Sequence, residues 1–144
     1  MLEYLTRQAL DGDYDFLFEL KKAAEYDAVK AVFGWDENIQ REIHADEWEE
    51  ARPNIIEVDG NRVGSFLLLD KGDHFYFCRF FLMPKLQGKG LGSRVLNDCL
   101  RQADDERKPV RLCYLQGHHV GKLYHKFGFS RCSEDAQFVY MERT

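Results

Sequence analysis

The spacing of hydrophobic positions predicts two helices in the first third of the chain. Between residues 14 and 32, apolar side chains recur every three or four positions, after the capping residues Asp11 and Asp13. A second helical pattern runs from Asp36, which can cap it, to about Ala51, and Pro53 ends it. The expected apolar stripes are Phe16, Leu17, Leu20, Ala23, Ala24, Ala28, Ala31 and Val32 in the first helix, and Ile39, Ile43 and Trp48 in the second. Four charged side chains of the first helix should face water: Lys21, Lys22, Glu25 and Lys30.

Strand-like runs occupy most of the remaining chain. They are expected at residues 2–7, 55–58, 63–69, 75–83, 110–115 and 138–141, with a short partner for the last at 129–132. The turn Asp59-Gly60-Asn61 predicts a hairpin between the second and third of these runs. A helix to about Arg107 is expected from the periodic residues Leu91, Val95, Leu96, Cys99, Leu100 and Ala103. A short helix over 119–127 should end at Gly128.

This order of elements predicts the fold class. One α/β domain over residues 1–144 is expected, with a mixed, largely antiparallel central sheet flanked by helices. The length suits a single domain with a hydrophobic core and is too short for two.

A glycine-spaced turn separates the strand at 75–83 from the helix that follows it. Its sequence is Gln87-Gly88-Lys89-Gly90-Leu91-Gly92, after Leu82-Met83-Pro84. Glycine permits close approach of a ligand and left-handed backbone angles. The first amides of a helix lack intrahelical partners and bind anions. The turn therefore predicts a phosphate site, although its spacing matches neither a Walker loop nor a Rossmann fingerprint.

Two motifs together resemble the GNAT superfamily of acyl-CoA-dependent N-acyltransferases. The Leu-x-Pro and Gln-x-x-Gly-x-Gly pattern at 82–90 is similar to the family's pyrophosphate loop. The run Leu123-Tyr124-His125-Lys126-Phe127-Gly128-Phe129 looks like the family's LYxKxGF signature. Both occur in the family's order and cover about the last half of the chain. The resemblance implies a GNAT-like fold in which two central strands splay apart, and acetyl-CoA as cosubstrate.

The resemblance also implies which residues hold acetyl-CoA. Pantetheine would bond to the strand edge formed by Phe81, Leu82 and Met83, and the pyrophosphate to the amides from Gly88 to Ser93. Gln87 would order the loop or bond a phosphate oxygen, while Lys89 either adds charge or is a solvated lysine. Many relatives carry Asn before the last helix, where this chain has His118. The imidazole would either replace the hydrogen bond of that amide or contact CoA directly. Alternatively, it would indicate that this chain binds the cosubstrate differently. The implied cofactor-binding set is Phe81, Leu82, Met83, Gln87, Gly88, Lys89, Gly90, Leu91, Gly92, Ser93 and His118.

Acetyl transfer to an amine requires proton movements. A lysine-like amine is neutral in only about one molecule in 2,500 at pH 7, a cost of roughly 4–5 kcal/mol, so a base or a water chain to one is expected. A backbone N–H on the splayed strand would stabilise the oxyanion. Tyr124 stands where the family motif carries its tyrosine acid, and it would protonate the leaving thiolate; the alternative is a packed helix tyrosine. The candidate bases are His74, His118, His119 and Glu57.

The acceptor is expected near the link between the first two helices. Trp35 and Asp36 could hold an ammonium by cation–π and charge contacts. The alternative is a buried Trp35 with Asp36 as a helix N-cap. The acceptor class is a small-molecule or peptide amine.

Charge is uneven along the chain. Residues 1–60 hold 16 acidic and 6 basic side chains, and residues 61–144 hold 9 and 14. The basic half suits an anionic cosubstrate. The acidic half suits a cationic acceptor and argues against nucleic acid, including tRNA, as a partner. The alternative is that surface helices simply expose their charges to water.

Composition and cysteine spacing limit the remaining classes. No apolar run is long enough to cross a membrane, and the N-terminus shows no secretory pattern. The cysteines contain no CxxC pair, so no metal is expected, and they are expected to be reduced, mostly buried thiols of a cytoplasmic protein. A homodimer would agree with the family. Two other functions stay open: a non-catalytic acyl-CoA-binding or sensing domain, and a nucleotide-phosphate-binding domain of another fold.

Overall fold

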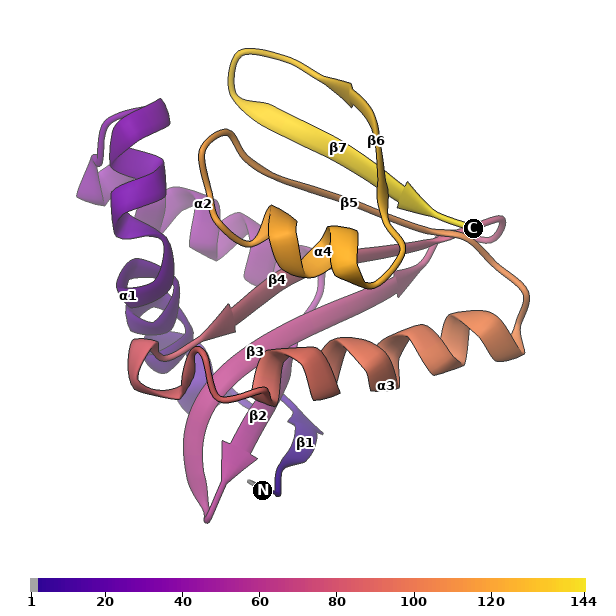
Figure 1. Cartoon of the computed structure of the whole chain (residues 1–144). Coiled ribbons are helices and arrows are strands. Elements are labelled where there is room, and N and C mark those ends of the chain that lie inside the picture. Colours follow the sequence, from indigo (N-terminus) through magenta and orange to yellow (C-terminus); the bar gives the residue numbers. More distant parts are fainter. Residues whose placement is uncertain (1–2) are drawn as a thin grey trace. The chain divides into compact units, whose positions relative to one another are not determined.

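The computed structural model describes residues 3–144, which form two compact units. The first unit contains residues 3–67 and 79–87, and the second contains residues 68–78 and 88–144. Two long strands contribute residues to both units: β3 (Asn61–Asp70) and β4 (Phe75–Leu82). Seven strands form a mostly antiparallel sheet in the order β1-β2-β3-β4-β5-β7-β6, and helices flank it (Figure 1). The predicted fold class is confirmed.

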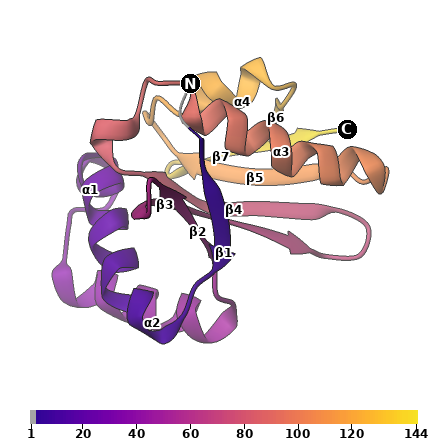
Figure 2. The same ribbon diagram turned by 90° about the horizontal axis from the view of Figure 1, so that it is seen from below.

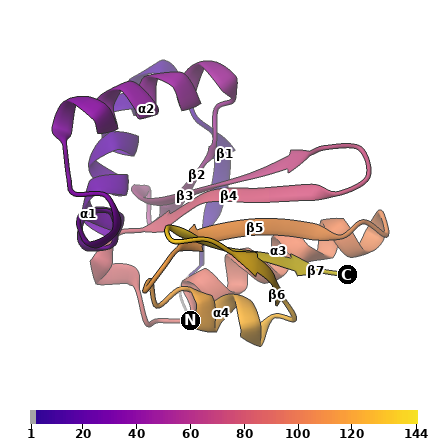
Figure 3. The same cartoon turned by 90° about the horizontal axis from the view of Figure 1, so that it is seen from above.

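The first unit combines short strands with two helices. Its complete elements are β1 (Leu5–Gln8), α1 (Tyr14–Val32), α2 (Glu37–Glu50) and β2 (Asn54–Val58). β2 pairs antiparallel with both β1 and β3, and the turn at Asp59 and Gly60 has the positive φ angles that a tight hairpin needs. Figures 2 and 3 show α1 and α2 on the same side of these strands. A cluster of Ala9, Leu17, Leu20 and Ile55 forms the core beneath them.

The second unit contains the remaining elements. They are α3 (Leu91–Asp105), β5 (Val110–Leu115), α4 (Gly121–Lys126), β6 (Ser130–Glu134) and β7 (Phe138–Arg143). Figures 2 and 3 show α3 and α4 on one side of β5. The buried residues of α3 are the six that the periodicity predicts: Leu91, Val95, Leu96, Cys99, Leu100 and Ala103. Gly128 follows α4 with a φ of 95°, as predicted for a helix C-terminus.

The parallel ladder between β4 and β5 is short. Phe75 pairs with Val110 and Tyr76 with Arg111. Within the second unit, no further pairing of described residues extends this ladder, although β5 continues to Leu115. By contrast, β5 pairs with β7 along its whole length. The divergence of the central strands that the resemblance implies therefore begins after the second pair.

Several detailed predictions were wrong. The expected stripes of both first-unit helices are shifted, because α1 buries Phe18 and Val29 while Ala23 and Ala31 are exposed. Ile39 and Ile43 of α2 are exposed, and the polar residues Gln40 and His44 are buried instead. The hydrogen bond from His44 to the carbonyl of Tyr14 holds that polar face inward.

Two further differences concern the first strand and the cysteines. The first strand begins at Leu5, and Leu2 of the expected strand lies outside the described residues. All four cysteines are free, yet only Cys99 is buried; Cys78 and Cys113 are half-buried and Cys132 is exposed. Cys132 lies on β6, where all five residues are exposed.

Candidate active site

The glycine turn and the start of α3 form an uncapped helix N-terminus in the second unit. Gly88 and Gly90 have φ angles of 75° and 82°, in the left-handed region that favours glycine. Gly90 is the N-cap residue, so within the described chain no side chain satisfies the first amides of α3. A Cβ at either glycine would meet open space. The turn thus presents helix amides, the positive end of a helix dipole and room for a phosphate.

The polar side chains of this turn differ in their surroundings. Lys89 is exposed, which agrees with a solvated lysine, and Ser93 is half-buried in the first turn of α3. In the first unit, the Gln87 side-chain amide donates a hydrogen bond to the carbonyl oxygen of Leu82 at 3.1 Å. Of the two roles expected for Gln87, this contact supports ordering of the loop.

The end of β4 in the first unit carries the residues expected beside pantetheine. Leu82 is buried, and Phe81 and Met83 are half-buried and pack against the core of that unit. Gly64 on β3 lies so close to this segment that a Cβ there would stand 2.6 Å from the carbonyl oxygen of Phe81. Glycine is therefore required at position 64 by packing rather than by its φ angle.

Tyr124 lies in an aromatic cluster of the second unit. Its side chain is buried, and its ring centroid lies 6.4 Å from that of Phe77, 6.1 Å from Tyr114 and 5.8 Å from Phe129. A Cβ at Gly121 would collide with the hydroxyl group of Tyr114, so any side chain there would require the Tyr114 ring to shift. This packing fixes the ring of Tyr124, and it agrees with a positioned phenol and with a purely structural tyrosine.

The imidazole of His118, just before α4, accepts a hydrogen bond from the backbone. The backbone N–H of Val120 donates to His118 Nδ1 at 3.0 Å, so this nitrogen is unprotonated and the neutral imidazole carries its proton on Nε2. An asparagine side-chain oxygen would accept the same bond. The ring of His118 stacks on His119 with centroids 4.7 Å apart, and His119 is exposed.

Two of the remaining candidate bases have ionic partners. His74 Nδ1 lies 2.6 Å from a carboxylate oxygen of Asp73, and this contact lowers the pKa of Asp73. Glu57 forms an ion pair with Arg7, whose Nε lies 3.4 Å from the carboxylate. Each of these two side chains therefore has a local carboxylate or guanidinium partner.

Trp35 and Asp36 have local partners in the first unit. Asp36 caps α2 by accepting a hydrogen bond from the amide of Ile39 at 3.0 Å. The indole N–H of Trp35 donates to Glu37 at 2.8 Å, and Lys22 Nζ lies 5.9 Å from the centre of the Trp35 ring. The hydrogen bond from Trp35 is the main reason that the pKa of Glu37 is lowered, and a second bond from Lys22 adds to it. Asp36 acts as the helix N-cap of the structural alternative, whereas Trp35 is half-buried rather than buried.

Sequence reasoning missed Arg79 and His44. Arg79 has a φ of 52° in the middle of β4, a strained angle for a residue with a side chain. His44 is buried on α2, and burial lowers its pKa. Both line a cavity of about 30 Å³ within the first unit. A strand residue predicted to be extended gives no sequence signal for a left-handed angle, but a histidine one turn after Gln40 does show that this helix face is polar.

Two structural absences concern the described residues. Among residues 3–144, no cluster of His, Cys, Asp and Glu side chains has the arrangement of a metal site. None of the helices in that range combines the length and apolar character needed to cross a membrane.

Similar solved structures define the class of fold. PaiA N-acetyltransferase from Thermoplasma acidophilum, in complex with coenzyme A, matches with a TM-score of 0.80 and 18% identity over 99% of both chains. Ribosomal-protein-S18-alanine N-acetyltransferase from Escherichia coli matches with 0.72 and 12% identity, over 98% of this chain and 93% of that chain. A GNAT family acetyltransferase from Elizabethkingia anophelis with acetyl-CoA bound matches with 0.62 and 13% identity over 97% of both chains. At these identities the similarity establishes the N-acetyltransferase fold.

The family itself is established by sequence. The family model described as an acetyltransferase (GNAT) domain matches residues 21–142, and the chain belongs to this family. A comparison with curated proteins gives no match. The resemblance seen in the two motifs is thereby confirmed, and the family performs acyl transfer from coenzyme A thioesters.

Proposed function

We propose that the protein transfers an acetyl group from acetyl-CoA to a primary amine of a small molecule or peptide. The amine would attack directly while both substrates are bound. The observation that carries this proposal is the uncapped N-terminus of α3 behind two left-handed glycines, in a chain of the GNAT family. We further propose that residues 1–144 act as one catalytic domain, in the cytoplasm.

The residues present fit the cosubstrate. Acetyl-CoA would supply the acetyl group, and the amides from Gly88 to Ser93 would bind its pyrophosphate. The open space at Gly88 and Gly90 supports this assignment, because no Cβ obstructs the approach to the amides. Gln87, which donates a hydrogen bond to the Leu82 carbonyl, would order the turn. Lys89 would lie on the exposed side of the turn and Leu91 on its buried side. The backbone of Phe81, Leu82 and Met83 would bond pantetheine, and His118 Nε2–H is a donor in place of the usual asparagine.

The chemistry assigns distinct tasks to protein groups. A backbone N–H on β4 would donate a hydrogen bond to the developing oxyanion. Tyr124 would donate its phenolic proton to the leaving sulfur, because a phenol stays protonated at pH 7. The tight aromatic packing around Tyr124 supports this role by fixing the position of the ring.

The acceptor is proposed only as a class. Trp35 and Asp36 stay a prediction for its binding, and the acidic N-terminal half favours a cationic amine. Among the similar structures, one is named as a ribosomal-protein-S18-alanine N-acetyltransferase, which supports keeping protein acceptors in the class. A homodimer also stays a prediction.

Calorimetric titration with acetyl-CoA, beside ATP and NAD, tests the cosubstrate. We expect micromolar binding of acetyl-CoA alone. Binding of ATP or NAD without acetyl-CoA would instead support a nucleotide-binding domain.

Turnover is tested by thiol release with a panel of primary alkylamines, amino acids and peptides. We expect at least one amine to release coenzyme A with formation of its N-acetyl product, detected by mass spectrometry. Tight acetyl-CoA binding with no turnover of any amine would instead support the acyl-CoA-binding alternative.

A further inference from the structure

The buried face of α2 is polar, contrary to its sequence pattern. Gln40 and His44 lie one helical turn apart and are 6% and 8% exposed, whereas Ile39 and Ile43 are 52% and 39% exposed. Gln40 Oε1 is buried and accepts no hydrogen bond from the described residues. Exposing isoleucines while burying polar groups costs stability. Local rules are broken in this way mainly at functional sites.

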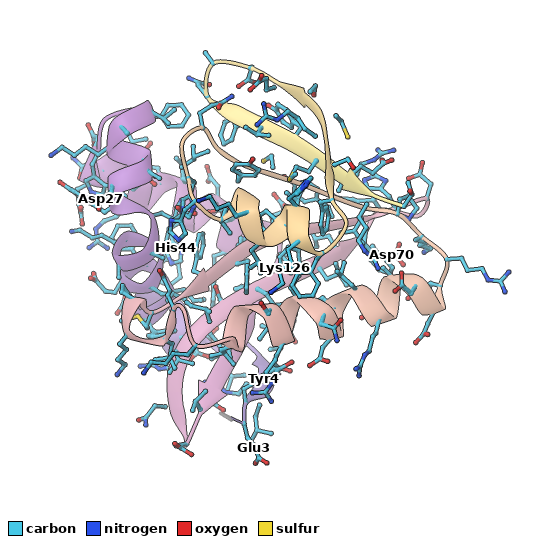
Figure 4. The ribbon with its side chains drawn as sticks, in the orientation of Figure 1. Glu3, Tyr4, Asp27, His44, Asp70 and Lys126 are labelled. Carbon is cyan, nitrogen blue, oxygen red and sulfur yellow. The ribbon has the colours of Figure 1, made fainter. Side chains whose placement is uncertain are left out.

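One imidazole nitrogen of His44 forms a hydrogen bond, and the other can accept a proton. Nε2 lies 2.9 Å from the carbonyl oxygen of Tyr14, which can only accept, so Nε2 carries the proton. The neutral ring therefore has a lone pair on Nδ1, for which the described residues provide no hydrogen-bond donor. The ring is held between Tyr14 and Phe18, with centroids 4.4 Å and 5.7 Å away. His44 (labelled in Figure 4) is thus a fixed base with a known tautomer.

The cavity beside His44 has room for a water molecule. Its volume of about 30 Å³ exceeds the roughly 10–15 Å³ that one water requires, and a buried water needs two to four polar partners. Much of the lining is apolar, but Ser65, Lys21, Glu47 and Arg79 join His44 in it and offer polar atoms to such a water.

The charged side chains that line this cavity form ion pairs. Glu47 lies 3.7 Å from Lys21 Nζ and 3.2 Å from Arg79 Nε. The groups facing His44 are Tyr14 and Lys21 from α1, Glu47 from α2 and Arg79 from β4. Burial is the main reason that the pKa of His44 is lowered; the Tyr14 carbonyl and Glu47 raise it, and Lys21 and Arg79 lower it further. The net lowering of this pKa favours the neutral ring, which is able to accept a proton.

The same cavity reaches the segment of β4 assigned to the cosubstrate. Phe81, the first of the three proposed pantetheine residues, and the left-handed Arg79 both line it. Arg79 is held in place by its hydrogen bond to the carbonyl of Ala51 at 2.6 Å and by Glu47. A water in this cavity can therefore bridge the imidazole and a group bound at this part of β4.

We propose that His44, through one water in this cavity, is the base that removes the ammonium proton of the acceptor. This inference rests on the proposed acetyltransferase function. The proton passes from the ammonium to the water while the water's proton passes to His44 Nδ1, which leaves a neutral amine and an imidazolium. The amine nitrogen then bonds to the acetyl carbon as the carbon–sulfur bond breaks, and Tyr124 protonates the sulfur. The second nitrogen proton restores Tyr124, and His44 returns its proton to solvent.

The test is His44→Gln, whose amide N–H still donates to the Tyr14 carbonyl but whose side chain is not a base. With the alkylamine that turns over fastest in the screen, we expect kcat/KM at pH 7 to fall about 100-fold. The loss should shrink toward pH 10, where the amine is itself neutral, and with the less basic hydrazine of the same carbon skeleton. Acetyl-CoA affinity should be unchanged. Ile43→Gln, an exposed neighbour on the same helix, is the matched control and should keep wild-type activity.

NMR provides a readout that does not depend on turnover. Nitrogen-15 spectra of the histidine rings should show the Nε2–H tautomer of His44 at pH 7 and protonation of Nδ1 only in more acidic solution. Wild-type turnover by His44→Gln, an equal loss at every pH, or a proton on Nδ1 at pH 7 would each overturn the proposal. If the wild-type protein binds acetyl-CoA but acetylates no amine, the proposed acetyltransferase function is contradicted, whatever the NMR spectra show for His44.

Discussion

The hydroxyl of Ser65 on β3 donates a hydrogen bond to the carbonyl oxygen of Arg79 on β4 at 2.8 Å. This bond fixes the backbone of the left-handed residue, while the Arg79 side chain is anchored to Ala51 and Glu47. A non-glycine residue in this region costs about 1–3 kcal/mol and persists where its surroundings determine it. Ser65 and α2 together provide those surroundings within the first unit.

Ser65→Ala should therefore destabilise the protein. Ser65 is 1% exposed, and the substitution leaves the partly buried Arg79 carbonyl without its hydroxyl donor. We expect the free energy of unfolding to fall by about 1–3 kcal/mol, measured by urea denaturation. Ser130→Ala, on the exposed strand β6, should change it by less than about 0.5 kcal/mol. Equal stability of the two variants would show that the bond contributes nothing.

Tyr124→Phe should lower turnover far more than cosubstrate binding. Removing only the hydroxyl keeps the aromatic packing with Phe77 and Phe129 but removes the proposed acid. We expect kcat to fall about 100-fold, with the acetyl-CoA dissociation constant within about threefold of wild type. Tyr140→Phe, at a half-exposed position on β7, is the control. Unchanged turnover of Tyr124→Phe would remove Tyr124 from the mechanism.

Gly90→Ala should weaken acetyl-CoA binding through the backbone. The added methyl group meets open space, so the penalty comes from the φ of 82°, where a Cβ costs about 1–2 kcal/mol. If the turn shifts to relieve this strain, the α3 amides are displaced and the dissociation constant measured by calorimetry should rise about tenfold. Gly12→Ala also meets open space but has no left-handed angle, so it should bind normally. Equal affinities would place the pyrophosphate elsewhere.

Asp13→Asn should change how stability depends on pH. Asp13 is 4% exposed and accepts hydrogen bonds from Arg7 at 2.7 Å, Arg62 at 3.1 Å and the Leu10 amide at 2.8 Å. The bond from Arg7 is the main reason that the pKa of Asp13 is far below its usual range. The unfolded chain therefore binds this proton more readily, so the stabilisation exists above about pH 4 and is lost as the pH falls further.

Urea denaturation at pH 7, 4 and 3 measures this effect. At pH 7 we expect Asp13→Asn to lose about 3 kcal/mol, because two arginines remain without their buried partner. Between pH 4 and pH 3 the wild type should lose more stability than the variant does. Asp46→Asn, at an exposed position on α2, should follow the wild-type pH dependence. Parallel curves for Asp13→Asn and wild type would contradict the assigned pKa shift.

The sequence predicts local structure well because local signals determine it. The start of α2, the hairpin at Asp59 and Gly60 and the buried face of α3 follow from a cap, turn residues and helical spacing. The proposed cosubstrate turn is predicted for the same reason, since Gly88 and Gly90 mark it directly.

The cavity in the first unit could not be predicted in this way. It depends on contacts between residues far apart in the chain, such as His44 with Tyr14 and Ser65 with Arg79. Hydrophobic spacing favours Ile39 and Ile43 as the buried face of α2, and the tertiary hydrogen bond of His44 opposes it. Lys21, which the pattern assigns to solvent, lines the cavity and pairs with Glu47 of α2.

The two-residue ladder between β4 and β5 has a consequence for isotope exchange. Along β5, alternate backbone amides point toward β7, where pairing is continuous, and the others point toward β4, where it stops after Arg111. Beyond that residue, the amides on one side of β5 are paired with a strand and those on the other side have no strand partner among the described residues. Deuterium uptake along Leu112–Leu115 should therefore alternate residue by residue between slow and fast, within a stretch of backbone that is uniformly extended.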